Sequence, residues 1–166
     1  MAFDSTPSSP TANSYVSVQQ AEDYFLYRND SSLWPTATLH KQQLLVTATR
    51  RLQSERFRGN KTVATQSLMF PMYYIIDSMG YELSSTTIPT AIIEATCELA
   101  YSYLITNEFS PAQLEHLDSY SASVGNISES YTLKKQVYSD LPTVVKIILE
   151  GCGFWVKKGS ITSISR

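Results

Sequence analysis

Apolar residues recur at helical spacing in four stretches of the chain, and this pattern predicts four helices. The first begins with a capping-box pattern, in which Ser17 and Gln20 satisfy each other's backbone N–H groups. The third is apolar around much of its circumference and carries Pro89 in its first turn, so we expect it at the centre of the domain. The four helices are expected over residues 17–28, 36–56 and 88–109 and from about Pro142 to Gly151.

The stretch between the second and third helices is loop-like and contains the apolar run LMFPMYYII. Pro71 interrupts this run, because it breaks a helix and removes a donor from a sheet ladder. We expect the run to lie across the helices as a hydrophobic lid, with Phe70, Tyr73 and Ile75 making the contacts. The aromatic cluster at Phe70, Tyr73 and Tyr74 is accordingly interpreted as core instead of a surface for stacking.

Residues 119–132 alternate in the manner of a strand and predict a β-hairpin. Gly125–Asn126 suits a two-residue type II′ turn, which requires glycine in the first central position. This register sets Val124 opposite Ile127, Ala122 opposite Glu129 and Tyr120 opposite Tyr131. Since an isolated hairpin is marginally stable in water, we expect the domain surface or a second subunit to complete it.

These elements predict a mainly α-helical fold, a small bundle with a protruding β-hairpin or extended arm and flexible ends. The expected parts are a flexible N-terminal arm over residues 1–14, a helical domain over residues 15–151 and a C-terminal tail over residues 152–166. The tail alternates apolar and polar residues, which suits addition of a strand to a partner's sheet edge.

The amino-acid composition of the chain argues against several classes of protein. The chain has 166 residues and a net charge of −2, which argues against a dedicated electrostatic DNA binder. Its two cysteines, Cys97 and Cys152, support neither a disulfide framework nor a zinc site. No apolar run is long enough to cross a membrane.

Catalytic chemistry is not expected, and no cofactor or metal is predicted. Glu115, His116 and Asp118 occupy nearly consecutive positions, which point in different directions on a helix. Cys97 falls in the most apolar helix, where a thiol is buried and inert. No glycine-rich phosphate loop follows a strand, so no enzymatic activity is predicted.

A basic cluster near the end of the second helix is the best candidate for a nucleic-acid contact. It includes the aromatic Phe57, and cations with aromatic rings are what hold single strands. We favour a simpler interpretation, because the chain has more acidic than basic residues. In this interpretation the arginines are solvated and complement the helix dipole. The cluster consists of Arg50, Arg51, Arg56, Arg58 and Lys61.

Two tryptophans are harder to assign. Trp34, next to Pro35, is expected to fill space in the core. Phe154 and Trp155 precede a basic tail and suit either the core or an anchor into a partner.

Four motifs occur in order along the chain and together resemble a family of small phage proteins, described as DnaT-like or as head–tail connectors (adaptors, head-completion proteins). The resemblance covers about residues 12–150. Where family members often carry Trp before Gly, and Trp-Pro later, this chain has FRG and MFP. The motifs are TANSYVSVQQAEDYF, FRGNKT…QSLMFP, IPTAIIEATCELA and SASVGNISESY…LPTVVKIIL.

The connector resemblance implies a virion structural protein at the neck, made in the host cytoplasm. It implies a ring, usually of about twelve copies, beneath the portal, with a tail, stopper or nozzle protein as the next partner and genomic DNA passing without specific binding. The hairpin would contact an adjacent subunit through Tyr120, Ala122, Val124, Gly125, Ile127 and Tyr131. The tail would dock on the portal through Phe154, Trp155, Lys157, Lys158, Ile161 and Ile164.

The label DnaT-like implies a different function, single-stranded DNA binding in replication. In this alternative the contacts would come from Arg50, Arg51, Arg56 and Arg58. Steeply salt-dependent binding to an oligonucleotide would favour it over the connector.

Overall fold

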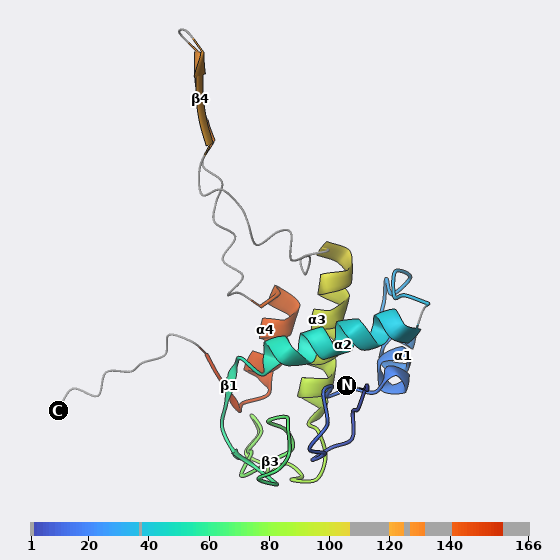
Figure 1. Ribbon diagram of the computed structural model, residues 1–166. Coiled ribbons are helices and arrows are strands. Elements are labelled where there is room, and N and C mark those ends of the chain that lie inside the picture. The colour runs from blue at the N-terminus through green and yellow to red at the C-terminus, as the bar shows by residue number, and fades with distance from the viewer. Residues whose placement is uncertain (1, 37, 107–119, 125–126, 132–140, 158–166) are drawn as a thin grey trace, which may run out of the picture.

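The computed structural model describes residues 2–36, 38–106, 120–124, 127–131 and 141–157 (Figure 1). The helices in this part of the chain are α1 (Val18–Leu26), α2 (Thr38–Leu52), α3 (Thr90–Thr106) and α4 (Thr143–Gly151). The strands are β1 (Arg56–Phe57), β2 (Asn60–Lys61), β3 (Met72–Tyr73), β4 (Tyr120–Val124), β5 (Ile127–Tyr131) and β6 (Trp155–Val156).

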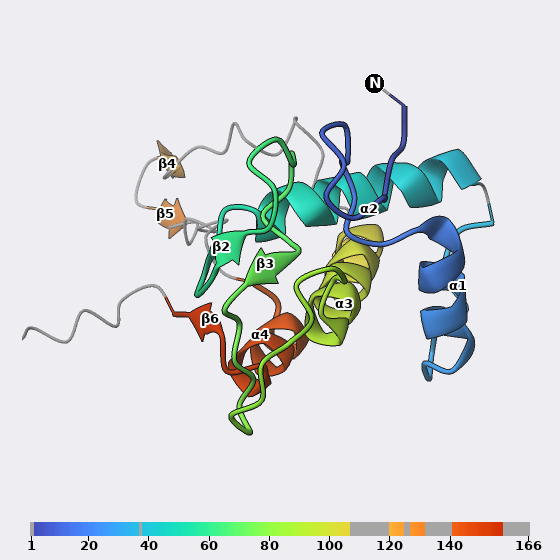
Figure 2. The ribbon, with the colours of Figure 1, turned by 90° about the horizontal axis from the view of Figure 1, so that it is seen from below.

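The helices begin and end close to their predicted positions. The capping box at the start of α1 is confirmed, since the Ser17 hydroxyl accepts from the Gln20 N–H and the Gln20 side chain accepts from the Ser17 N–H. The central place of α3 is also confirmed, because it packs against α1, α2 and α4 (Figures 1 and 2). On α2, the apolar residues Leu45, Ala48 and Leu52 share one face and are buried.

The prediction of a small helical bundle is wrong. Beside the helices, the described residues form three two-stranded antiparallel sheets and a long irregular segment between α2 and α3. This segment contributes Phe70, Met72 and Ile75 to the same buried cluster as the helices. The core therefore lies between helices and a layer of short strands and loops, which helical periodicity could not reveal because strands of two residues have no period to detect.

Two of the sheets fix this irregular layer. β1 pairs with β6 and β2 pairs with β3, so the end of the described chain is joined to the segment after α2 (Figure 2). The return from α4 to β6 passes through Gly153, which has a left-handed φ of +82°. A Cβ at this position would lie 2.6 Å from the Ser78 backbone nitrogen, so only glycine fits here without displacement.

The hairpin register is confirmed. β4 and β5 are antiparallel, with Val124 opposite Ile127 and Tyr120 opposite Tyr131. No other described strand pairs with them. The turn residues Gly125 and Asn126 lie outside the described residues, and the role of the hairpin in a subunit contact stays a prediction.

The N-terminal segment makes specific contacts. The Asp4 carboxylate accepts hydrogen bonds from the Ser9 and Thr11 hydroxyls, and these bonds hold the Asp4 pKa well below its usual value. Farther along, Tyr15 is buried, and its N–H donates to the Thr49 hydroxyl of α2. The predicted division into arm, domain and tail remains untested, but residues 2–16 add hydrogen bonds and core contacts to the domain.

Candidate nucleic-acid interface

Along β1 and the residue that follows it, side chains alternate, and this separates Arg56 and Arg58 from the aromatic residue between them. Successive side chains of a strand point to opposite sides. Phe57 points inward, where its ring lies 5.0 Å from that of Phe70 and 6.3 Å from that of Phe154. Arg56 and Arg58 are exposed, and neither forms an ion pair with any carboxylate of the described chain. Phe57 is thus core, and the two arginines are free to contact a ligand.

The other members of the predicted basic cluster have different surroundings. Arg50 is exposed on α2. Arg51 is engaged, since its guanidinium donates to Glu55 Oε1 at 2.7 Å and to the Ser54 hydroxyl at 2.7 Å. Lys61 is exposed, although its Nζ donates to the Gln66 carbonyl at 3.0 Å. The structure therefore leaves Arg56, Arg58 and Lys61 exposed in or next to β1 and β2, and it removes Arg51 from the set of available cations.

Two exposed tyrosines lie in and directly after β3, the strand that pairs with β2. Tyr73 stands opposite Asn60 in the β2–β3 ladder, and its carbonyl oxygen is 3.0 Å from the Cβ position of Gly59. Tyr73 is 43% exposed and Tyr74 is 73% exposed, and their ring centroids are 6.1 Å apart. The predicted lid contacts of Phe70 and Ile75 are confirmed, but burial of Tyr73 and Tyr74 is wrong. The apolar run divides its side chains between the core and the solvent.

We call the exposed set at β1, β2 and β3 the arginine–tyrosine surface. Strands β2 and β3 lie on the opposite side of α3 from α1 (Figure 2). The cations of this surface could be identified from the sequence but its tyrosines could not, because the apolar run from Leu68 to Ile76 gives no sign of which positions face outward. The surface consists of Arg56, Arg58, Lys61, Tyr73 and Tyr74.

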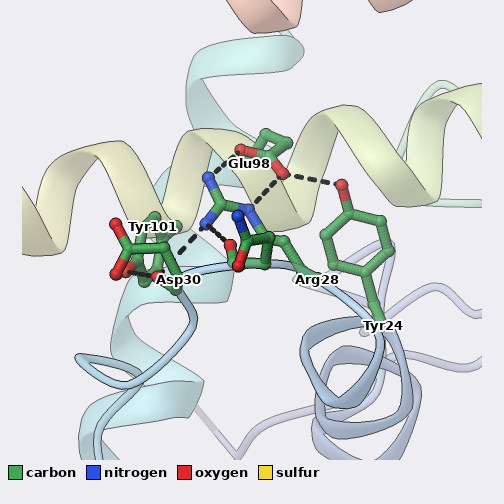
Figure 3. A network of polar contacts seen from close by, with 6 residues as sticks. Tyr24, Arg28, Asp30, Glu98 and Tyr101 are labelled. Carbon is green, nitrogen blue, oxygen red and sulfur yellow. Dashed lines mark hydrogen bonds and ion pairs between the residues drawn. The ribbon is translucent and has the colours of Figure 1, made fainter.

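A second polar group joins the end of α1 to α3 (Figure 3). Arg28 donates from Nε to Glu98 Oε1 at 2.6 Å and from Nη2 to Glu98 Oε2 at 3.0 Å, and the Tyr24 hydroxyl donates to the same carboxylate at 2.7 Å. Burial alone would raise the Glu98 pKa, but the hydrogen bonds from Arg28 and Tyr24 outweigh it, so the pKa is lowered. The Arg28 guanidinium also lies 4.3 Å above the ring of Tyr101. The polar groups of these side chains are therefore used in contacts within the fold.

The predicted docking tail is partly incorporated into the domain. Phe154 is buried, and Trp155 Nε1 donates to Glu55 Oε2 at 3.3 Å. The exposed Lys157 pairs with Glu150 at 3.0 Å. Of the two readings of Phe154 and Trp155, this packing favours the core, whereas Lys158, Ile161 and Ile164 lie outside the described residues. Trp34 behaves as predicted, since it stacks on Phe25 with ring centroids 4.2 Å apart.

The residues considered for catalysis or metal binding do not form a site in the described chain. Cys97 is buried, and burial raises the pKa of its thiol to about 12. Glu115, His116 and Asp118 lie outside the described residues. Among the residues that the structure covers, no three His, Cys, Asp or Glu side chains are placed to hold a metal ion, and no helix is long and apolar enough to span a bilayer.

The family to which the chain belongs follows from its match to a known family. Residues 1–162 match the model of the family described as "Putative DnaT-like ssDNA binding protein". The chain belongs to this family. No curated protein and no solved structure matches it. The DnaT-like part of the sequence resemblance is thereby confirmed.

The match corrects the other part of that resemblance. The head–tail connector identity is not supported, since the family is described by single-stranded DNA binding and not by a place at the portal vertex. The basic cluster, which we interpreted as solvated arginines, therefore gains weight as a contact for nucleic acid. The expected self-association and the absence of enzymatic activity remain untested predictions.

Proposed function

We propose that the chain binds single-stranded DNA and that the arginine–tyrosine surface is where it does so. The observation that carries this proposal is the pair of exposed arginines Arg56, in β1, and Arg58, directly after β1, which have no acidic partner among the described residues and precede β2 by a few residues. A cation that is not neutralised internally can neutralise a phosphate and release its counterion. The membership of the DnaT-like family supports the same function.

The acidic balance of the chain does not oppose this function. Ion pairs such as those of Glu22, Glu55 and Glu98 with Lys41, Arg51 and Arg28 remove carboxylates and cations in equal number, so the net charge does not show where unpaired cations lie. Charges separated by more than about 10 Å are largely screened at 0.1 M salt. A phosphate at the arginine–tyrosine surface therefore responds to the nearby cations more strongly than to the net charge of −2.

The test is the affinity for a fluorescent oligothymidylate, measured by anisotropy at several salt concentrations. If Arg56, Arg58 and Lys61 each contact a phosphate, the plot of log K against log salt has a slope of about −2 for a single strand. The double variant Arg56→Gln/Arg58→Gln should bind more weakly and have a slope nearer about −0.7.

The matched control is Lys157→Gln. It removes one positive charge from a residue that is exposed but already paired with Glu150, so its salt slope should equal that of the wild type. No measurable binding by the wild-type protein at low salt would overturn the proposed function. Equal slopes for the wild type and the double variant would refute the placement on β1.

A further inference from the structure

The arginine–tyrosine surface contains a residue whose backbone is held in an unfavourable conformation. Tyr74 has a φ of +60°, in the left-handed region. Ser8 and Asp30 share this sign of φ, and Asp tolerates it because its short polar side chain can bond locally, but a bulky aromatic residue rarely adopts it. Such positions concentrate at ligand-binding sites, where the surrounding structure imposes them.

The surroundings of Tyr74 explain how the conformation is maintained. The residues on both sides of the tyrosine pair are anchored, since Met72 and Ile75 are buried and the Ile75 carbonyl accepts from the Leu83 N–H at 2.9 Å. Tyr73 and Tyr74 are consecutive but both exposed, which a regular strand would not allow because successive side chains point to opposite sides. The left-handed turn at Tyr74 thus places two adjacent rings in solvent.

The pair has no role within the described fold that would explain this exposure. Neither hydroxyl has a hydrogen-bond partner in the part of the chain that the structure covers, and the contact of each ring with an aromatic partner is with the other ring. Tyr24 and Tyr101 differ, since Tyr24 donates to Glu98 and Tyr101 donates to the Asp30 carbonyl. Two adjacent exposed rings suit an external partner with flat apolar faces.

We infer that Tyr73 and Tyr74 stack on unpaired bases of the bound strand, with Tyr74 contributing most because its ring is the more exposed. This inference rests on the proposed single-stranded DNA binding and adds the base contact to the phosphate contacts of Arg56 and Arg58. Stacking on aromatic rings tolerates any base but needs the base to be unpaired. The tyrosine pair would therefore provide the preference for single over double strands that the arginines alone cannot supply.

The experiment compares an oligothymidylate with an abasic oligonucleotide of the same length, which keeps the phosphates and lacks the bases. On the thymidylate, Tyr74→Ala should weaken binding by about fivefold to thirtyfold, while Tyr74→Phe should bind like the wild type because it keeps the ring. On the abasic strand, Tyr74→Ala and the wild type should bind equally. Tyr27→Ala is the control, since Tyr27 is 89% exposed but adjoins the paired Arg28.

A second variant separates stacking from misfolding. Tyr74→Gly also removes the ring but relieves the left-handed strain, so its Tm should exceed that of Tyr74→Ala by about 2–4 °C while its loss of affinity is the same. Wild-type binding that Tyr74→Ala leaves unchanged, or weakens equally on the abasic strand, would overturn the stacking inference and leave the proposed function standing. Absence of wild-type binding to either strand would refute both.

Discussion

Two regions of this molecule use the same residue types for different purposes. Between α1 and α3, Arg28 is bound to Glu98 and flanked by Tyr24 and Tyr101, and the Glu98 side chain is only 6% exposed (Figure 3). At the arginine–tyrosine surface, arginines and tyrosines of equal chemistry lie in solvent without an acidic partner among the described residues. The two regions differ in whether a carboxylate lies close enough to pair with the arginine. Where a buried glutamate is present, the charges stabilise the fold, and where none is present they remain available to a ligand.

The largest expected effect comes from removing that carboxylate. Glu98→Gln leaves the Arg28 guanidinium, which is 25% exposed, without its counterion, and we expect a loss of about 2–3 kcal/mol in the free energy of unfolding. Urea denaturation at pH 7 measures it. Arg58→Gln is the matched change at the other region and should alter stability by no more than about 0.5 kcal/mol. Similar losses for the two variants would contradict the comparison.

A smaller effect should follow when single hydroxyl groups are removed. Tyr24→Phe takes one donor from the Glu98 carboxylate and should cost about 1–2 kcal/mol. Tyr74→Phe removes a hydroxyl that faces solvent and should be neutral within about 0.5 kcal/mol. Thermal unfolding of the two variants, side by side, distinguishes these outcomes. A destabilised Tyr74→Phe would mean that its hydroxyl has a structural partner.

The smallest expected effect is a dependence of the free energy of unfolding on pH. Because the pKa of Glu98 is lower in the folded chain than its ordinary value of about 4.5, its contribution is complete above that value and is lost as the pH falls through the folded pKa. The stability difference between the wild type and Glu98→Gln should therefore shrink as the pH is lowered below about 4.5. The comparison with the variant cancels the separate contribution of Asp4, whose pKa is also lowered. A difference that stays constant with pH would argue against an ionised Glu98 in the folded state.

The sequence predicted the elements that depend on local patterns. The capping box at Ser17, the apolar circumference of α3 and the hairpin register between Tyr120 and Tyr131 all follow from neighbouring residues, and all three are confirmed. The pairing of Arg28 with Glu98 joins positions 70 residues apart, so no periodicity could reveal it. The same limit hid the sheets of two-residue strands and led to the incorrect helical bundle.

Only part of the candidate site could be predicted, and the reason is similar. A cluster of arginines is visible in a sequence, but whether each one has an acidic partner depends on the fold, as the contrast between Arg51 and Arg58 shows. Tyr73 and Tyr74 were assigned to the core because they belong to the same apolar run as Phe70 and Ile75, which are buried. Only the left-handed backbone at Tyr74 turns both rings outward, and a conformation of this kind is rare enough for tyrosine that the sequence would not predict it.

The most direct test of the account is photocrosslinking of the full chain to an oligonucleotide containing 5-iodouracil, followed by mass spectrometry of the crosslinked peptides. Iodouracil crosslinks preferentially to aromatic side chains against which it stacks. We expect crosslinks at Tyr73 or Tyr74, and fewer of them at high salt. We expect none at Tyr24 or Tyr101, because both side chains are engaged in contacts around Glu98. Crosslinks confined to the α1–α3 side, with Tyr73 and Tyr74 unmodified, would contradict it.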